Sequence, residues 1–376
     1  MFLGISGAQD YVVLFTVIAA AVTVLAIVLS IPITDVVWKY APYAYPMPRA
    51  KAVEAECFER DDIEEMVEGD LRDVIAKVEA RVEPETVRKL LDERDPKPLE
   101  LELKRDAVRS LLKVAESSPE GTDEVVRALT ARYELEDVKA VVRAHHAGTE
   151  PEDLVDEPVL LPSDVWHEIK RAATLAEVID LLQGTPYDDG SLEEAFSEYE
   201  ETGNLFVLES ALDRAYYSYL WDLVVTEKAE EELFPVLGIE VDLYNVEVAI
   251  RGIFLGLTPE ERERAMADGG WELLEWRKRE LAQAEDVTDV VETLSGTALG
   301  PFLEEAREEY MEEKDPRAFD KALRKARYEL VSEILETDLI GAPAVVSAVY
   351  AKQRDVDNVV SIVNAKLAGV EPLVVF

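Results

Sequence analysis

The residues with the clearest chemical potential form a short acidic cluster. Asp61-Asp62-Ile63-Glu64-Glu65 places carboxylates at i and i+3 or i+4, so a helix would present them on one face, as a Mg2+ site requires. No second group of Asn, Ser and Glu ligands stands out elsewhere in the chain. Because 80 of the 376 residues are Asp or Glu, this spacing also arises by accident. The preferred interpretation is a solvated helix face.

The three histidines add little to this chemistry. His145-His146 invites a metal site, but His146 aligns with Phe254 and Leu367 in the internal register described below. Both aligned residues are apolar, which favours a half-buried packing role for His146. His167 has no second ligand nearby in the sequence.

Other signatures of catalysis are missing from the sequence. Cys57 is the single cysteine, which excludes an intrachain disulfide and a Cys-rich metal site. Neither GxxxxGK[ST] nor GxGxxG occurs, so nucleotide binding has no support. Tyr216, Tyr217, Tyr219 and Trp221 are spread around a helix and are expected in core and rim positions. The sequence thus predicts no catalytic, cofactor-binding or metal-ligating residue, no cofactor and no small-molecule substrate.

The net charge of −41 restricts the partners of the protein. Such a surface repels phosphate backbones, so a nucleic-acid partner is excluded. Basic protein patches and metal cations remain compatible with it. The acidity also suits a salty cytoplasm, where self-repulsion is screened, without any partner.

A long apolar stretch lies near the amino terminus. Val12–Ile33 contains 22 residues without a charge, which as a helix would extend about 33 Å and cross a bilayer. We therefore expect a short tail over 1–11 and a transmembrane helix over 12–34. A cleavable signal peptide is the weaker alternative, because no Lys or Arg precedes the stretch. The basic residues that follow it, Lys39, Arg49 and Lys51, place the body of a cell-membrane protein on the cytoplasmic side.

The segment after this stretch is rich in proline. Residues 35–48 contain Pro42, Pro46 and Pro48, and proline favours extended chain over helix continuation. The segment is expected to be a semi-rigid linker.

From residue 49 onward the sequence is dominated by helical periodicity. Period-two alternation is almost absent, and short candidates such as 159–161 and 373–376 are too few to build a sheet. The body is therefore predicted to be all-α.

The body also repeats itself three times. The segments DVKAVVRAHHAG (137–148), NVEVAIRGIFLG (245–256) and NVVSIVNAKLAG (358–369) have equal length and are separated by 108 and 113 residues. Upstream, three pairs share one offset of 111 residues: Tyr199 with Tyr310, Ala211 with Ala322, and Tyr217 with Tyr328.

Each repeated segment has the features of a helix that ends in a glycine cap. A small residue would let another helix approach, the final glycine suits a left-handed cap, and a proline follows three residues later. The small residues are Ala144, Gly252 and Ala365. The final glycines are Gly148, Gly256 and Gly369, and the prolines are Pro151, Pro259 and Pro372. Three residues upstream of each segment lie Glu134, Asp242 and Asp355, of which Asp242 and Asp355 are interpreted as N-caps.

The repeats divide the body into three helical units, over 49–157, 158–267 and 268–376. Three like units arranged around an axis would leave a funnel or a central cavity. This arrangement is a hypothesis that rests on the number of repeats.

Several of these motifs together resemble the C subunit of archaeal-type (A/V-type) rotary ATP synthases, the counterpart of the d subunit of eukaryotic vacuolar ATPases. They are Tyr43-Ala44-Tyr45 with Arg49, LESALDRAYYSYL (208–220), VDLYNVEVAIRGIFLG (241–256), Asp268-Gly269-Gly270 and AVYAKQRDVDNVVSIVNAKLAG (348–369). The resemblance covers about residues 49–376.

The resemblance implies a funnel-shaped, non-catalytic rotor subunit. It would sit on the cytoplasmic face of the proteolipid ring and receive the central stalk formed by subunits D and F. Members of the family usually begin near the Tyr/Arg motif and lack a membrane helix, whereas Val12–Ile33 precedes that motif here. A helix outside the ring would collide with the stator during rotation, so we expect the stretch to insert into the centre of the ring.

Two alternatives from other functional classes remain open at this stage. One is a membrane-anchored, all-α, Mg2+-dependent enzyme that acts on prenyl diphosphates through Asp61, Asp62 and Glu65, by analogy with terpenoid synthases. The other is a helical scaffold unrelated to ATP synthases.

Overall fold

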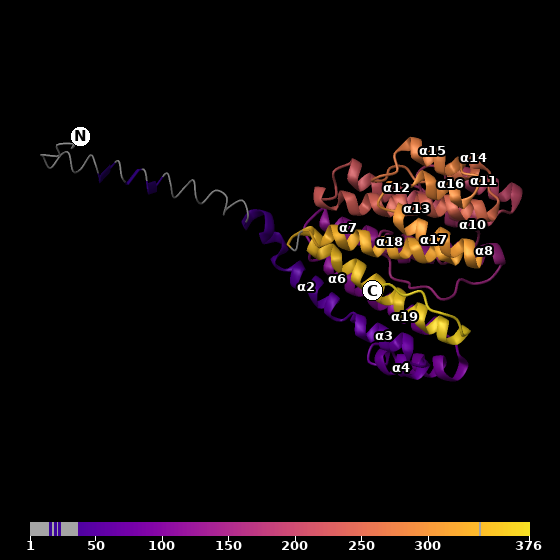
Figure 1. Ribbon diagram of the computed structural model, residues 1–376, viewed down its shortest axis with the longest axis horizontal. Helices are drawn as coiled ribbons and strands as arrows, with labels where there is room; N and C mark the ends of the chain where they lie inside the picture. Colours follow the sequence, from indigo (N-terminus) through magenta and orange to yellow (C-terminus); the bar gives the residue numbers. More distant parts are fainter. Residues whose placement is uncertain (1–14, 17–18, 21, 24–36, 338–339) are drawn as a thin grey trace, which may run out of the picture.

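The computed structural model describes residues 15–16, 19–20, 22–23, 37–337 and 340–376. Within these residues all regular structure is helical and no strand occurs (Figure 1). The predicted all-α class is therefore confirmed.

The predicted transmembrane helix over 12–34 lies outside the described residues, apart from three pairs. Residues 15–16, 19–20 and 22–23 are helical. Among the helices formed by described residues, none has the length and apolar character that crossing a membrane requires.

The segment expected to be an extended linker is helical where the structure describes it. Residues 37–40 are helical, a 3-10 turn η1 spans Ala41–Ala44, and α2 begins at Pro46. The expectation was wrong because Pro42 and Pro46 occupy the first positions of their helices. There the missing N–H costs no hydrogen bond and the fixed φ favours the helix.

Helices α2 to α8 build the first third of the body. The segment between α5 and α6 is a π-helical turn, η2, and α7 and α8 are separated by a single residue, Ala131. The bounds are α2 (Pro46–Ala55), α3 (Arg60–Glu68), α4 (Leu71–Val78), α5 (Pro84–Arg88), η2 (Lys89–Glu93), α6 (Lys97–Ala115), α7 (Thr122–Thr130) and α8 (Arg132–Ala147).

The rest of the chain forms two further groups of helices in a similar order, from short to long. The first group comprises α9 (Ser163–Ile169), α10 (Leu175–Leu182), α11 (Leu192–Thr202), α12 (Leu205–Val225), the 3-10 turn η3 (Glu231–Leu233) and α13 (Phe234–Leu255). The second comprises α14 (Pro259–Ala265), α15 (Glu275–Gln283), α16 (Val287–Thr293), α17 (Gly300–Glu313), α18 (Arg317–Leu335) and α19 (Ala342–Ala368).

The long helices form the interior of the body. α13 packs against α12 and α18, and α19 packs against α2, α6, α7 and α18. α2, near the start of the chain, thus lies along α19, near its end (Figure 1). Buried apolar side chains from all three groups belong to one continuous core.

The three predicted glycine caps are confirmed. Gly148, Gly256 and Gly369 follow α8, α13 and α19 with φ of 68°, 72° and 72°. Their left-handed conformation lets the last carbonyls of each helix accept hydrogen bonds, as in other glycine C-caps.

The predicted N-cap role of Asp242 and Asp355 is wrong. α13 and α19 begin at Phe234 and Ala342, so both aspartates lie inside their helices. Asp242 instead accepts hydrogen bonds from the backbone N–H groups of Trp271, Glu272 and Leu273, at 3.0, 2.7 and 3.2 Å.

Glu134 in α8 has the same role in the preceding group of helices. It accepts from the backbone N–H groups of Val159, Leu160 and Leu161, of which Val159 N is nearest at 2.7 Å, and from the Tyr187 hydroxyl at 2.6 Å. Burial raises the pKa of Glu134, while these hydrogen bonds lower it. A buried carboxylate in a long helix thus holds the chain just before a following short helix.

Asp137, Asn245 and Asn358, one turn further along the same helices, hold other segments of backbone. Asp137 accepts from Val155 N and Asp156 N, at 2.9 and 2.8 Å. Asn245 bonds both the N–H and the carbonyl of Ala267, and Asn358 does the same with Val375. These polar side chains bind backbone that runs past each long helix, which explains why they are tolerated inside it.

Candidate functional site

The candidate site is a polar pocket where helices from all three groups converge. It has a volume of about 150 Å3 and lies among α8, α12, α13, α18 and α19. The charged residues that line it are Arg132, Glu240, Glu247, Arg251, Asp320, Arg324, Arg327 and Asp357.

A buried ion pair forms the floor of this pocket. The Nε of Arg327 in α18 lies 2.7 and 3.0 Å from the two carboxylate oxygens of Glu240 in α13, and its Nη2 donates to Gln353 Oε1 at 2.7 Å. Burial opposes the charge of Arg327 most strongly, but Glu240 and neighbouring tyrosines raise the pKa of Arg327 above its usual range. The pair joins the second and third groups of helices.

Tyrosines complete the network around Glu240 and Arg327. Tyr350 donates to Glu240 at 2.8 Å, and Tyr328 donates to Asp357 at 2.8 Å. Tyr217 stacks on Tyr244, with ring centroids 4.2 Å apart. Each buried hydroxyl or charge that is bonded in this way fixes the relative positions of the helices that carry it.

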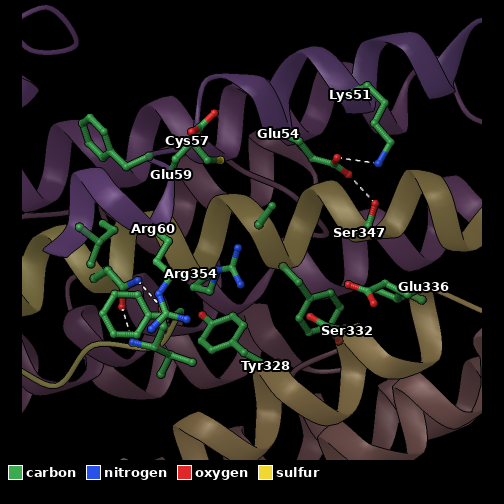
Figure 2. Close-up of a pocket in the computed structure, with 18 of the residues that line it drawn as sticks. Lys51, Glu54, Cys57, Glu59, Arg60, Tyr328, Ser332, Glu336, Ser347 and Arg354 are labelled. Atoms are coloured by element: carbon green, nitrogen blue, oxygen red, sulfur yellow. Dashed lines mark hydrogen bonds and ion pairs between the residues drawn. The ribbon is translucent and has the colours of Figure 1, made fainter. Parts of the chain in front are cut away.

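A second, larger cavity lies where the start of the body meets its end (Figure 2). It has a volume of about 400 Å3 and is lined by residues of α2, α3, α18 and α19. Figure 2 shows Glu54 between Lys51 and Ser347, which both bond to it. The Lys51 and Glu54 charges are therefore compensated within the protein, and we interpret this cavity as a gap in packing between the ends of the chain.

The acidic cluster 61–65 does not face either hollow as a carboxylate set. Asp62 and Glu65 both contact Lys77, at 2.6 and 2.7 Å, and Glu64 contacts Arg60 at 2.7 Å. The ion pair with Lys77 lowers the pKa of Asp62. The cluster is a solvated face of α3 paired with cations. Within the portion of the chain that the structure describes, no group of three or more His, Cys, Asp or Glu side chains could hold a metal ion.

The remaining sequence candidates take structural positions. His146 is exposed, and its Nδ1 lies 2.9 Å from the Tyr199 hydroxyl, so the expected half-buried role is wrong. Tyr216 is buried and donates to the carbonyl of Ala128 at 3.0 Å, as expected for a core residue. Cys57 is half-buried, and burial raises the pKa of its thiol to about 12.

The residues of the central pocket were not identified from the sequence. Arg132, Glu240 and Arg327 look like ordinary surface charges in a chain that is 32% charged. A signal was nevertheless available, since Arg132, Glu240 and Gln353 each lie five residues before the start of a repeated segment. This common position predicts that the three residues lie on equivalent faces of their helices.

Comparison with known proteins gives one consistent match. A model of the family described as ATP synthase (C/AC39) subunit matches residues 46–373. The C subunit of the A-type ATP synthase of Methanocaldococcus jannaschii is 28% identical over 346 residues, which cover 90% of this chain and 86% of that protein. The Methanothermobacter thermautotrophicus protein of the same name is 26% identical, with 97% and 93% covered. The Haloferax volcanii protein of that name is 28% identical over 245 residues, or 64% of this chain and 69% of its own length.

Proposed function

The chain belongs to the family of ATP synthase (C/AC39) subunits, and from this premise we propose that it is the rotor subunit that couples the central stalk to the proteolipid ring. Members of this family are structural subunits of a rotary ATP synthase rather than enzymes. This assignment excludes both the prenyl-diphosphate enzyme and an unrelated scaffold.

The central pocket is the observation that carries the proposal. One wall comes from α8, another from α12 and α13, and a third from α18 and α19. An object seated there would contact all three groups of helices, so torque would be distributed over the whole body. We propose that the end of the stalk, formed by subunits D and F, sits over this pocket.

We also propose that the body consists of three like units, over 49–157, 158–267 and 268–376. Three observations support this division. The order from short to long helices recurs in the second and third groups, the left-handed glycine caps occur at the same position in all three, and Asp137, Asn245 and Asn358 hold passing backbone in the same way.

The amino-terminal segment is proposed to lead from the body into the membrane. Tyr43 is only 3% exposed, and its hydroxyl bonds Thr122 at the start of α7 and Glu230 just before η3. Lys39 contacts Glu232 at 2.7 Å. These contacts hold residues 39–43 against the body, and we propose that residues 12–34 lead from there into the centre of the ring. Cross-links from position 20 to the outer ring surface, with none to the inner wall, would refute this placement.

We propose that the negative charge of the body helps it to bind its partners in the ATP synthase. With a net charge of −41 the body would attract basic loops on the ring or the stalk. The body would lie on the cytoplasmic side of the cell membrane.

Purification of the tagged native protein in mild detergent tests the proposal. Mass spectrometry should recover the proteolipid together with subunits D and F, with one copy of this chain per complex. Recovery of the chain alone, under conditions that keep the rest of the ATP synthase intact, would refute the coupling role.

A further inference from the structure

Of three residues at one common position, two line the central pocket and the third binds Arg327, another residue of its lining. Arg132 in α8, Glu240 in α13 and Gln353 in α19 each lie five residues before Asp137, Asn245 and Asn358, respectively. Glu240 and Gln353 both bind the guanidinium of Arg327. Arg132 differs from them, because its side chain makes no hydrogen bond with a described residue and has no described carboxylate within 4.0 Å.

The other cations of the pocket are satisfied within the protein. Arg327 pairs with Glu240, Arg251 contacts Glu247 at 2.6 Å, and Arg324 donates to the carbonyl of Leu373 at 3.1 Å. The carboxylate of Asp357, whose charge raises the pKa of Arg132, accepts a hydrogen bond from Tyr328. Among the guanidinium groups that line the pocket, that of Arg132 is therefore the one that makes no hydrogen bond and no ion pair with a described residue.

Arg132 keeps its charge in this environment. The positive charge of Arg327 and burial both act to lower the pKa of Arg132, but Tyr217, Asp357 and Tyr328 hold it above its usual value. A guanidinium carries five N–H donors, and those of Arg132 have no hydrogen-bond partner among the described residues. Donors left open in a polar pocket are available to an acceptor on another protein.

We propose that Arg132 binds the side-chain carboxylate of an Asp or Glu on the protein that sits in the central pocket. The inference rests on the proposed function, in which that protein is the end of the central stalk. A guanidinium matches a carboxylate with two parallel hydrogen bonds, which fixes orientation as well as position. A single side chain suits the volume of about 150 Å3, which is below the roughly 300–1,000 Å3 of small-molecule sites.

This role makes a prediction that a merely structural arginine would not satisfy. Arg132→Gln removes no hydrogen bond that the described residues of the free protein make, so its unfolding midpoint should stay equal to that of the wild type or increase. A structural role would lower the midpoint. The stability measurement also establishes that the variant folds before its binding is compared.

Calorimetric titration of the full-length protein with the purified central stalk tests the proposal. Arg132→Gln should weaken binding about 10- to 100-fold, as expected for the loss of a charge-assisted hydrogen bond. The affinity of Arg132→Lys should lie between those of the wild type and Arg132→Gln, because lysine keeps the positive charge but cannot form two parallel hydrogen bonds to a carboxylate. Arg109→Gln is the matched control and should bind like the wild type, since Arg109 is exposed and paired with Glu157.

The outcomes separate the two proposals. If the wild type binds the stalk and Arg132→Gln binds equally well, the role of Arg132 is overturned while the coupling function stands. If the wild type does not bind the stalk, the proposed function itself fails. In addition, one Asp→Asn or Glu→Gln variant at the stalk end should reproduce the loss and cause no further loss when combined with Arg132→Gln. Additive losses for every such variant would overturn the carboxylate partner.

Discussion

Asp355, in the middle of α19, accepts a hydrogen bond from the backbone N–H of Phe58, a residue 297 positions earlier in the chain, at 2.8 Å. Its second carboxylate oxygen lies 2.6 Å from Nη2 of Arg81. Phe58 precedes α3 by two residues, as Leu161 precedes α9 and Leu273 precedes α15. Asp355 thus does for the start of the body what Glu134 and Asp242 do for the segments that follow them.

Of these three contacts, that of Asp355 joins the end of the body to its start. Glu134 and Asp242 hold backbone that is close in sequence, whereas Asp355 holds backbone from the other end of the body. Arg81 supplements this contact, and its guanidinium also lies 4.8 Å from the centre of the Phe58 ring. The cavity of Figure 2 lies along the same line of contact.

Asp355→Asn should loosen this closure. The amide oxygen can still accept from Phe58, but Arg81 loses its counter-charge in a largely buried position, which should cost about 2–3 kcal/mol of unfolding free energy. Denaturant titration measures the loss. The single cysteine, Cys57, adjoins Phe58 and should react faster with a thiol reagent in the variant than in the wild type. Asp61→Asn, on the solvated face of α3, is the control, and equal labelling rates for the two variants would contradict the closure.

Asp242 should make stability depend on pH. Burial raises the pKa of Asp242 to about 7, against the effect of its three backbone hydrogen bonds, which lower it. Below about pH 4 the group is protonated in both states, and between about 4 and 7 only the folded chain keeps the proton. Its contribution to stability is therefore present at low pH and lost as the pH rises through about 7.

The test compares wild type with Asp242→Asn, which cannot titrate. The difference between their unfolding free energies should change by up to ~1.4 kcal/mol per pH unit between about pH 4 and pH 7, and then level off. Denaturant midpoints across this range measure it. A constant difference would show that Asp242 has the same pKa in the folded and unfolded chains.

Gly269→Ala should be far more damaging than Gly256→Ala. Both glycines have positive φ, of 83° and 72°, which costs another residue about 1–2 kcal/mol. At Gly256 an added Cβ meets nothing within 4 Å, but at Gly269 it would lie 2.1 Å from Cγ of Trp221. Overpacking should add about 1–3 kcal/mol at Gly269. Thermal and denaturant unfolding decide the matter, and equal losses at the two sites would count against the close approach of Trp221.

Arg327→Met should destabilise the protein by about 3–5 kcal/mol, because it leaves the Glu240 carboxylate buried without its cation. Glu240→Gln in the same chain should recover some of this loss, since the charge that lacked a partner is then gone. A double-mutant cycle measures the coupling between the two residues. Losses that simply add would show that the ion pair does not act as a unit.

The class of fold could be predicted from the sequence, because helical periodicity and glycine caps are local signals. Gly148, Gly256 and Gly369 end their helices where their spacing indicates. Asp242 and Asp355 were misassigned for the opposite reason. An aspartate before an apolar stretch is typical of an N-cap, and the backbone that these side chains hold is distant in the sequence. Local patterns carry no information on such contacts.

The central pocket also depends on contacts between residues that are distant in the sequence. Arg327 is buried because Glu240, Gln353 and Tyr328 surround it, and these partners come from several helices. Composition alone places an arginine at the surface. The helical proline segment was missed because proline has opposite effects at the first turn and in the interior of a helix, and the sequence did not locate the start of α2 at Pro46.

The most direct test of the coupling role is a cross-link between the body and the stalk in the assembled ATP synthase. Glu247→Cys, on the rim of the central pocket, is combined with Cys57→Ser and joined to a cysteine at the stalk end. If both partners rotate together, ATP-driven ion pumping should persist at high cross-linking yield, whereas a cross-link from the body to the stator should stop it. Loss of pumping in proportion to the yield of the stalk cross-link, with recovery after reduction, would contradict the account.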